Sequence, residues 1–285
     1  MGHKTMAKDI KQAYVIGHNI GYSKSPMIHN YWLKLHGIAG QYQIKDISSA
    51  AIKKTIQSFR EDENFTGCNV TLPHKQSIMD YLDDIDETAL KIGAVNTVYR
   101  SGEKLKGTNT DAFGFMENLK HHISKDLLIG IKQKRAHIIG AGGAARAILY
   151  ALIQEGFQNI SLQNRTMDKA EALAIKFAGN TTIIAQNHSV NNIDGDVGLV
   201  INTTNLGMTG HPPLVLDLSA LNELAIIVDI VYNPLHTDLL KQASLRGNPV
   251  VTGIGMLLHQ ARPAFKLFFG KMPQVDNKLE ERILG

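Results

Sequence analysis

The segment 134–156, KRAHIIGAGGAARAILYALIQEG, joins a short apolar strand pattern to a glycine turn and a long helical pattern. Gly140, Gly142 and Ala145 stand in it at the spacing G-x-G-x-x-A. There the first glycine permits a tight turn, the second lets the backbone approach a pyrophosphate, and the helix N-terminus attracts the anion. The alternative is a glycine turn that serves only the fold. The segment predicts a Rossmann domain with the cofactor-binding residues Gly140, Ala141, Gly142, Gly143, Ala144 and Ala145.

Strand and helix patterns alternate on both sides of this turn. Strand patterns occupy 13–17, 42–47, 65–72, two runs within 94–111, and then 159–164, 198–204, 225–231 and 249–253. Helical patterns occupy 25–37, 49–62, 75–82, 255–270 and 275–284. Runs such as IIVDIV carry apolar residues on both faces, which is typical of parallel strands covered on both sides. We expect an α/β fold with two domains, an N-terminal α/β domain of residues 1–111 and a Rossmann domain of residues 112–255.

Composition and charge limit the classes of function. The 285 residues are 44% apolar and 20% charged, which is typical of a globular protein with one large or two ordinary domains. The net charge of +4 favours small anionic ligands and is too diffuse to indicate nucleic acid. The twelve histidines form no H-E-x-x-H motif, so we expect no metal.

The single cysteine, Cys68, permits no intrachain disulfide and favours a reducing compartment. We interpret it as a small core residue rather than a nucleophile. The first ten residues lack the apolar core of a secretion signal, and no stretch reaches the ~18 apolar residues of a spanning helix. We therefore expect a cytoplasmic protein without membrane contact.

The end of the strand after the glycine turn indicates which cofactor binds. An NAD site places Asp or Glu there to bind the ribose hydroxyls. This chain has Asn164, Arg165 and Thr166 instead, with Lys169 close behind. A guanidinium offers paired donors that suit a 2′-phosphate, so we predict NADP for residues 112–255. The alternative is a solvent-exposed arginine without a ligand.

Four further motifs, SKSP at 23–26, GCNVTLPHK at 67–75, GAVNT at 93–97 and GTNTD at 107–111, lie in the N-terminal part. Together with GAGGAAR, NRT, DIVYNP at 229–234 and GIGMLLHQ at 253–260, they resemble the shikimate dehydrogenase family in order along nearly the whole chain. The resemblance implies reversible reduction of 3-dehydroshikimate to shikimate by NADPH, in aromatic amino acid biosynthesis.

The resemblance also implies roles for individual residues. The catalytic pair is Lys75 and Asp111, and the substrate-binding residues are Ser23, Ser25, Asn69, Thr71, Asn96, Tyr232 and Gln260. Further cofactor-binding residues are Thr203, Met208, Ile230, Gly253 and Met256. Because Gln260 belongs to the substrate group, we expect the helices within 256–285 to return to the N-terminal domain.

Residue chemistry agrees with these roles. A small ring with several hydroxyls and one carboxylate requires many short polar side chains, since each buried hydroxyl must be matched. Ser23 and Ser25 precede a predicted helix, whose N–H groups favour an anion; the alternative for Ser25 is helix capping. Met256 and Gln260 are four residues apart and are expected on one helix face, although a core Met beside an incidental Gln is the alternative.

Lys75 and Asp111 fit the proton transfer that accompanies hydride transfer to a carbonyl. At the start of the predicted helix 75–82, the helix dipole would lower the pKa of Lys75, and a nearby Asp111 would raise it again. We interpret Lys75 as the proton donor and Asp111 as the group that orients it, although the pair could titrate as one unit. The alternative for Lys75 is a solvated surface lysine, and the alternative for Asp111 is a helix N-cap.

Two other functions stay open at this point. One is an enzyme of the same scaffold that acts on quinate, and the other is a non-catalytic NADP(H)-sensing module. A sensor has no need of a proton donor, which favours an enzyme. We expect a small-molecule substrate, no nucleic acid or membrane partner, and a monomer or homodimer.

Overall fold

The computed structural model describes residues 10–187 and 193–284, and the expectation about a secretion signal in the first ten residues falls mostly outside them. The chain divides into two compact units. The first unit runs to Thr110 and resumes at Ala261, and the second is Asp111–Gln260. The second boundary falls inside the long helix α9 (Gly253–Phe269).

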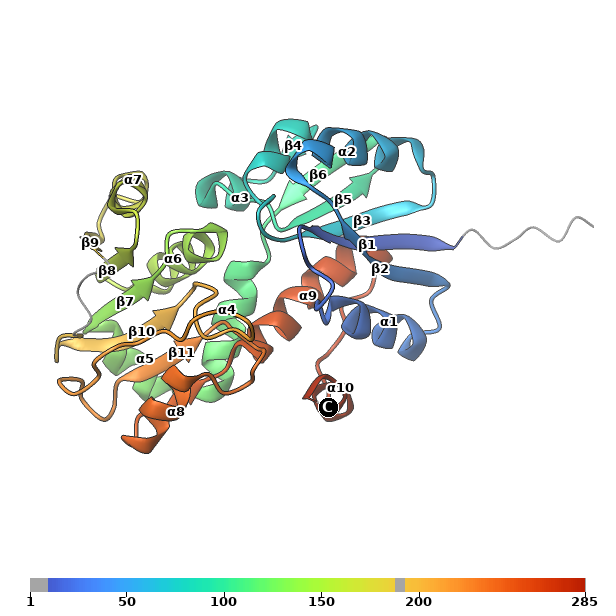
Figure 1. Cartoon of the computed structure of the whole chain (residues 1–285). Coiled ribbons are helices and arrows are strands. Elements are labelled where there is room, and N and C mark those ends of the chain that lie inside the picture. The colour runs from blue at the N-terminus through green and yellow to red at the C-terminus, as the bar shows by residue number, and fades with distance from the viewer. Residues whose placement is uncertain (1–9, 188–192, 285) are drawn as a thin grey trace, which may run out of the picture. The chain divides into compact units, whose positions relative to one another are not determined.

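The first unit is built on a mixed six-stranded sheet with the order β2-β1-β3-β5-β6-β4 (Figure 1). Its strands are β1 (Lys11–Gly17), β2 (Gly40–Asp46), β3 (Phe65–Val70), β4 (Asp84–Ile85), β5 (Thr97–Ser101) and β6 (Lys104–Thr108). Its helices are α1 (Ser25–Leu35), η1 (Ser49–Ala51), α2 (Ile52–Glu61), η2 (Ser77–Tyr81), α3 (Glu87–Ile92) and α10 (Asn277–Leu284). The strand β1 pairs in parallel with β2 and β3, and β5 is antiparallel to β3 and β6.

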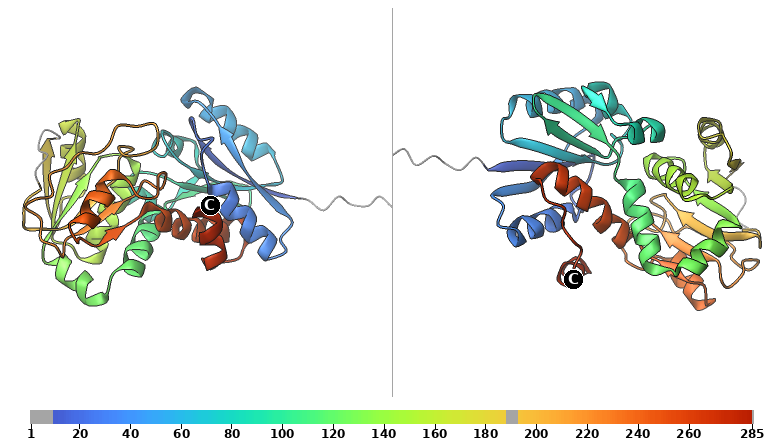
Figure 2. Two further views of the ribbon diagram at one scale, coloured as in Figure 1. Left: turned by 60° about the horizontal axis from the view of Figure 1, so that its bottom comes forward. Right: turned by 180° about the vertical axis from the view of Figure 1, so that it is seen from behind.

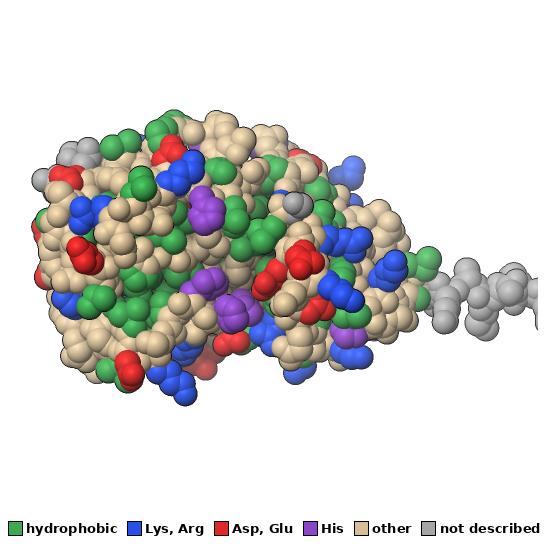
Figure 3. Space-filling model, turned by 90° about the horizontal axis from the view of Figure 1, so that it is seen from below, with side chains coloured by type: hydrophobic (Ala, Val, Ile, Leu, Met, Phe, Trp, Pro, Cys, Tyr) green, Lys and Arg blue, Asp and Glu red, His purple; other side chains and the backbone are tan. Residues whose placement is uncertain are grey.

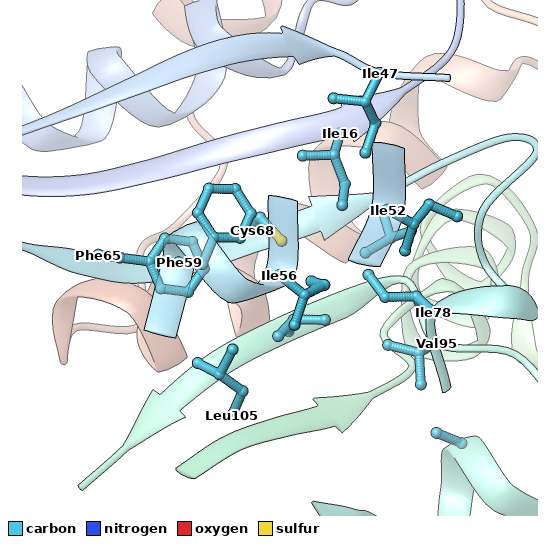
Figure 4. Packing of buried hydrophobic residues seen from close by; sticks show 13 residues of the cluster. Ile16, Ile47, Ile52, Ile56, Phe59, Phe65, Cys68, Ile78, Val95 and Leu105 are labelled. Atoms are coloured by element: carbon cyan, nitrogen blue, oxygen red, sulfur yellow. The ribbon is translucent and has the colours of Figure 1, made fainter. Parts of the chain in front are cut away.

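Both faces of this sheet are covered. On one face, apolar side chains of α2 pack against β3, with the rings of Phe59 and Phe65 stacked at 4.1 Å (Figure 4). Cys68 is buried in this core, which confirms its prediction as a core residue, and burial raises the pKa of its thiol. On the other face lie α1 and the C-terminal part of α9 (Figure 2). Gly67 allows that approach, because an added Cβ would lie 2.3 Å from Cδ1 of Phe268.

The helix predicted over 75–82 is wrong. The structure has only the 3₁₀ helix η2, five residues long. The carbonyl of Lys75 accepts a hydrogen bond from the N–H of Val95 at 2.7 Å, so this carbonyl serves a long-range contact instead of a first helical turn.

The second unit contains a parallel six-stranded sheet with the order β12-β11-β10-β7-β8-β9. The strands are β7 (Arg135–Ile139), β8 (Asn159–Asn164), β9 (Thr182–Asn187), β10 (Val197–Asn202), β11 (Ile226–Asp229) and β12 (Val250–Val251). The helices are α4 (Asp111–His122), α5 (Lys125–Lys132), α6 (Gly143–Glu155), α7 (Met167–Lys176) and α8 (Asp238–Leu245). Helices lie on both faces of the sheet, which confirms the predicted Rossmann arrangement (Figure 1). The strand β9 was not predicted.

The strand order of this sheet locates its ligand site. The chain leaves β7 toward β8 and β9 on one side and later toward β10, β11 and β12 on the other. In open α/β sheets, ligands bind outside the carboxyl ends of the strands where the order reverses. The turn after β7 and the loop after β10 therefore form the expected cofactor site.

The rest of the described surface adds two findings. Within residues 10–187 and 193–284, no helix is both long and apolar enough to cross a membrane, and no three His, Cys, Asp or Glu side chains are grouped to hold a metal ion. On the face seen in Figure 3, basic, acidic and hydrophobic side chains are interspersed.

Candidate functional site

The loop that carries Ser23 is fixed by a carboxylate at the end of β2. Asp46 accepts the backbone N–H groups of Asn19 at 3.1 Å and Ile20 at 3.0 Å. The hydrogen bond from Ile20 is the largest cause that holds the pKa of Asp46 below its ordinary value. The N–H of Ser23 in turn donates to the carbonyl of Ile20 at 2.9 Å. The half-buried Ser23 thus stands at a defined place before α1.

Ser25 is the first residue of α1, and Lys24 occupies the N-cap position. The alternative interpretation of Ser25 as the cap is therefore wrong. Instead, the N–H of Ser25 donates to Oγ of Ser23 at 3.3 Å, and the Ser25 side chain is buried. Both serines lie at the positive end of an eleven-residue helix, which favours an anion there.

A chain of buried hydroxyl and amide groups crosses the first sheet near the carboxyl end of β3. The hydroxyl of Tyr42 donates to Oδ1 of Asn69 at 2.7 Å, and Nδ2 of Asn69 donates to Oγ1 of Thr97 at 3.1 Å. The chain continues from Oγ1 of Thr97 to Oδ1 of Asn96 at 2.9 Å, and from Nδ2 of Asn96 to Oγ1 of Thr110 at 2.9 Å. The predicted residues Asn69 and Asn96 thus belong to one network.

The sequence did not single out three members of this network. Thr97 and Thr110 lie inside the motifs GAVNT and GTNTD, so the motifs could have indicated them. Tyr42 gives no signal beyond its place in an alternating strand pattern.

The same network fixes the backbone around the predicted catalytic pair. The carbonyl of Lys75 accepts the N–H of Val95, and Oδ1 of the next residue, Asn96, accepts the N–H of Thr110 at 2.8 Å. Thr110 directly precedes Asp111, which is buried and begins α4. Lys75 is half-buried, and it does not begin an α-helix.

Thr71 follows β3, and both its backbone N–H and its backbone carbonyl are hydrogen-bonded. Its N–H donates to the carbonyl of Ile16 at 2.9 Å, and its carbonyl accepts the N–H of His74 at 2.9 Å. An added Cβ on Gly17 would lie 2.6 Å from Cγ2 of Thr71, so β1 and this turn are in close contact.

The glycine turn of the second unit is compatible with a bound dinucleotide. Gly140 has φ +114°, and an added Cβ would lie 2.4 Å from Oγ1 of Thr203, which itself donates to the carbonyl of Ile139 at 2.7 Å. At Gly142 an added Cβ would meet no described atom within 4 Å, so that backbone is open to a ligand. Ala145 is fully buried where α6 packs on the sheet. Ala141 precedes this helix, and Gly143 and Ala144 form its first turn.

The predicted 2′-phosphate residues follow β8. Asn164 ends that strand, and its Nδ2 donates to the carbonyl of Thr166 at 2.7 Å. Arg165, Thr166 and Lys169 are exposed. The two cationic side chains are accessible to a phosphate.

Two more cations lie on the helices that precede and follow β8, Arg146 near the start of α6 and Lys176 at the end of α7, and the sequence singled out neither. Arg146 on α6 is half-buried, and burial lowers its pKa. Burial and then the charge of Arg146 lower the pKa of Lys176 on α7. An anion bound near Arg146 and Lys176 would offset the repulsion between their charges. Arg146 stands within the motif GAGGAAR, which could have indicated it.

A buried carboxylate anchors the loops after β10 and β11. Oδ1 of Asp229 accepts Nδ2 of Asn202 at 2.9 Å and the N–H of Val231 at 3.0 Å, and Oδ2 accepts the hydroxyl of Thr237 at 2.7 Å. Oδ1 of Asn202 accepts the N–H and the hydroxyl of Thr204. Burial raises the pKa of Asp229 to about 6. The predicted residues that these two loops carry are Thr203, Met208, Ile230 and Tyr232.

The helix α9 begins in close contact with the second of these loops. An added Cβ on Gly253 would lie 2.2 Å from the carbonyl oxygen of Ile230. An added Cβ on Gly114 of α4 would lie 2.6 Å from Cβ of Gln260 and 2.8 Å from the carbonyl oxygen of Met256. Met256 and Gln260 therefore share one face of α9, as predicted, and both are buried.

Comparison with protein families gives matches along most of the chain. Residues 15–98 match the shikimate dehydrogenase substrate binding domain, residues 122–230 match shikimate / quinate 5-dehydrogenase, and residues 253–277 match the shikimate 5′-dehydrogenase C-terminal domain. The shikimate dehydrogenase (NADP(+)) of Chelativorans sp. (strain BNC1) is 42% identical over 280 residues, which are 98% of this chain and 98% of that protein.

Solved structures are similar over the same length. Shikimate 5-dehydrogenase from Thermus thermophilus, in complex with NADP(H) and shikimate, has a TM-score of 0.81 and 34% identity, and the match covers 96% of this chain and 98% of that one. Quinate dehydrogenase from Corynebacterium glutamicum, in complex with NAD, has a TM-score of 0.85 and 30% identity, with coverage of 96% and 98%.

Proposed function

Because this chain belongs to the shikimate dehydrogenase family, we propose that it reduces 3-dehydroshikimate to shikimate reversibly with NADPH. The observation that carries this proposal is the buried network from Tyr42 to Thr110, whose short polar groups suit a polyhydroxylated ring. The backbone of Lys75 is attached beside this network, at Val95. A site that hydrogen-bonds each substrate hydroxyl rejects analogues that lack one.

The substrate would be held by the first unit's polar residues together with Tyr232 and Gln260. Ser23 and Ser25 would donate to its carboxylate, and the N-terminus of α1 would add a favourable field. Asn69, Thr71 and Asn96 would bind its ring hydroxyls, because amide and hydroxyl oxygens accept hydrogen bonds from hydroxyl groups. The substrate-binding part would be residues 1–111 with the helices of 256–285.

The cofactor would be held by residues 112–255 and supplies the hydride when bound. The open backbone at Gly142 and the N-terminus of α6 would receive the pyrophosphate. Arg165 and Lys169 would bind the 2′-phosphate. Thr203, Met208, Ile230, Gly253 and Met256 would contact the nicotinamide side.

Lys75 and Asp111 would carry the proton transfer. The Lys75 ammonium would donate a proton to the substrate oxygen during reduction and the amine would accept it during oxidation. The Asp111 carboxylate would orient the ammonium and accept a hydrogen bond from the substrate.

One assay tests this function against its rivals. NADP reduction is followed at 340 nm with shikimate, with quinate and with neither. We expect rapid reduction with shikimate alone, since quinate carries an extra hydroxyl at the carboxylate-bearing carbon. Equal or faster turnover of quinate would favour the broader enzyme, and tight NADP binding without turnover of either acid would favour a sensing module.

We also propose that the enzyme works in the cytoplasm as a monomer or homodimer. The free, buried Cys68 supports a reducing compartment. Light scattering on the purified protein decides the oligomeric state, because a mass of twice 31.3 kDa identifies the dimer.

A further inference from the structure

Tyr42 on β2 contacts α1 through Asn30 and His29, and it contacts β3 through Asn69. The sequence assigned it no role. We propose that Tyr42 is a positioning residue for substrate binding, whose buried hydroxyl orients the Asn69 carboxamide. The inference rests on the proposed function, because it names the group that aligns one of the proposed substrate contacts. Its support comes from the backbone, the ring and the hydroxyl of Tyr42.

The backbone of Tyr42 is clamped by a side chain of α1. Nδ2 of Asn30 donates to the carbonyl of Tyr42 at 2.8 Å, and the N–H of Tyr42 donates to Oδ1 of Asn30 at 3.0 Å. This paired contact fixes the position of Tyr42 relative to the helix that begins with Ser25.

The ring of Tyr42 is fixed by a second residue of α1. The imidazole of His29 lies flat on it, with ring centroids 4.0 Å apart and an interplanar angle of 5°. Trp32, Phe265 and Phe268 surround that imidazole. Tyr42 is 1% exposed and His29 is fully buried, so the phenol has little room to move.

The hydroxyl of Tyr42 then contacts one of the proposed substrate-binding residues. It donates to Oδ1 of Asn69 at 2.7 Å. Burial raises the pKa of the phenol well above 10, so it remains a proton donor at every physiological pH.

This donation determines which group Asn69 offers to a ligand. Nδ2 of Asn69 donates to Oγ1 of Thr97 at 3.1 Å and to the carbonyl of Asn96 at 3.4 Å, which uses both amide hydrogens. Oδ1 has two lone pairs and Tyr42 takes one, so the second can accept a substrate hydroxyl. Without the phenol hydroxyl, the carboxamide loses the contact that holds Oδ1 in this orientation.

The test is Tyr42→Phe, which keeps the ring, the stack on His29 and the backbone clamp. We expect the KM for shikimate to rise about tenfold, which corresponds to about 1.4 kcal/mol, while kcat changes less than threefold and the Kd for NADP stays constant. The matched control is Tyr14→Phe on β1, whose hydroxyl bonds Gln12 and whose ring stacks on Phe59. The control should keep the wild-type KM.

A purely structural role would lower the melting temperature of Tyr42→Phe and leave KM unchanged, and that result would overturn the proposal. If Tyr42→Phe does not fold, a variant with 4-aminophenylalanine at position 42 tests the proposal, because its amine restores a hydrogen-bond donor. A wild-type KM in that variant supports the proposal, and a tenfold rise contradicts it. Failure of the wild-type protein to oxidise shikimate would instead overturn the proposed function, and this inference with it.

Discussion

The backbone carbonyl of Lys75 accepts a hydrogen bond from the N–H of Val95 at 2.7 Å. This bond joins the turn after β3 to the segment before β5, twenty residues along the chain. The next residue, Asn96, accepts the N–H of Thr110 through Oδ1. Lys75 and the residue that precedes Asp111 are therefore attached to the consecutive positions Val95 and Asn96. The geometry of Lys75 therefore depends on the sheet rather than on a local helix.

We predict that Lys75→Met lowers kcat at least a hundredfold, because general acid–base catalysis typically contributes 10²–10⁴-fold. The Kd for NADP, measured by fluorescence titration, should not change. Lys53→Met on the exposed side of α2 serves as the control and should keep full activity. Near-normal turnover by Lys75→Met would contradict its proposed role.

Arg165→Ala should weaken NADP binding roughly 10- to 100-fold, since a hydrogen bond to a charged group contributes about 1.5–3 kcal/mol. NAD lacks the 2′-phosphate and supplies the internal control. Isothermal titration of both cofactors makes the comparison. An equal loss of affinity for NADP and NAD would contradict the assignment of Arg165 to the 2′-phosphate.

His29 should make the first unit sensitive to acid. Burial lowers its pKa to about 3, and among the described residues neither ring nitrogen has a hydrogen-bond partner. The unfolded chain binds this proton near pH 6.5 and the folded chain does not, so stability is lost as the pH falls below 6.5.

For His29→Phe, the free energy of unfolding should therefore fall less steeply with acidification than in the wild type. The difference should reach about 2 kcal/mol between pH 6.5 and 5.0, at about 1.4 kcal/mol per pH unit. Urea unfolding at several pH values measures it. His236→Gln, at an exposed position, should keep the wild-type slope.

Asp229 should act in the opposite direction on the second unit. Its folded pKa of about 6 lies above the unfolded value near 3.8, so its favourable contribution is present at low pH and is lost as the pH rises through 6. Asp229→Asn should remove this trend, a change of about 2 kcal/mol between pH 4.5 and 6.0. Asp238→Asn, an exposed carboxylate paired with Lys241, is the control. An unchanged slope in Asp229→Asn would contradict the prediction.

Gly67→Ala should destabilise the protein by about 1–3 kcal/mol, as overpacked cores do. The added Cβ would lie 2.3 Å from Cδ1 of Phe268 and 2.6 Å from the carbonyl oxygen of Val98. Gly130→Ala in α5 is the control, because its Cβ would meet no described atom within 4 Å and alanine favours a helix. Thermal unfolding of both variants tests the packing.

The sequence by itself determined the architecture of the second unit. The glycine spacing at Gly140 and Gly142 and the apolar parallel strands are local signals, and each reflects a local requirement for backbone freedom or burial. The sequence also indicated the polar motifs of the first unit, because residues adjacent along a strand end or turn stay together in the fold.

Only the tertiary structure decided which residues, distant along the chain, support these motifs. Tyr42 and Asn69 are 27 residues apart, as are Asn202 and Asp229. Asn202 and Asp229 meet because the parallel neighbours β10 and β11 end at one edge of their sheet, and Tyr42 reaches Asn69 because only β1 separates β2 from β3. The failed helix at 75–82 has the same cause. A local pattern cannot show that the carbonyl of Lys75 finds its partner at Val95, since backbone hydrogen bonds between strands depend on register, which is set by the whole sheet.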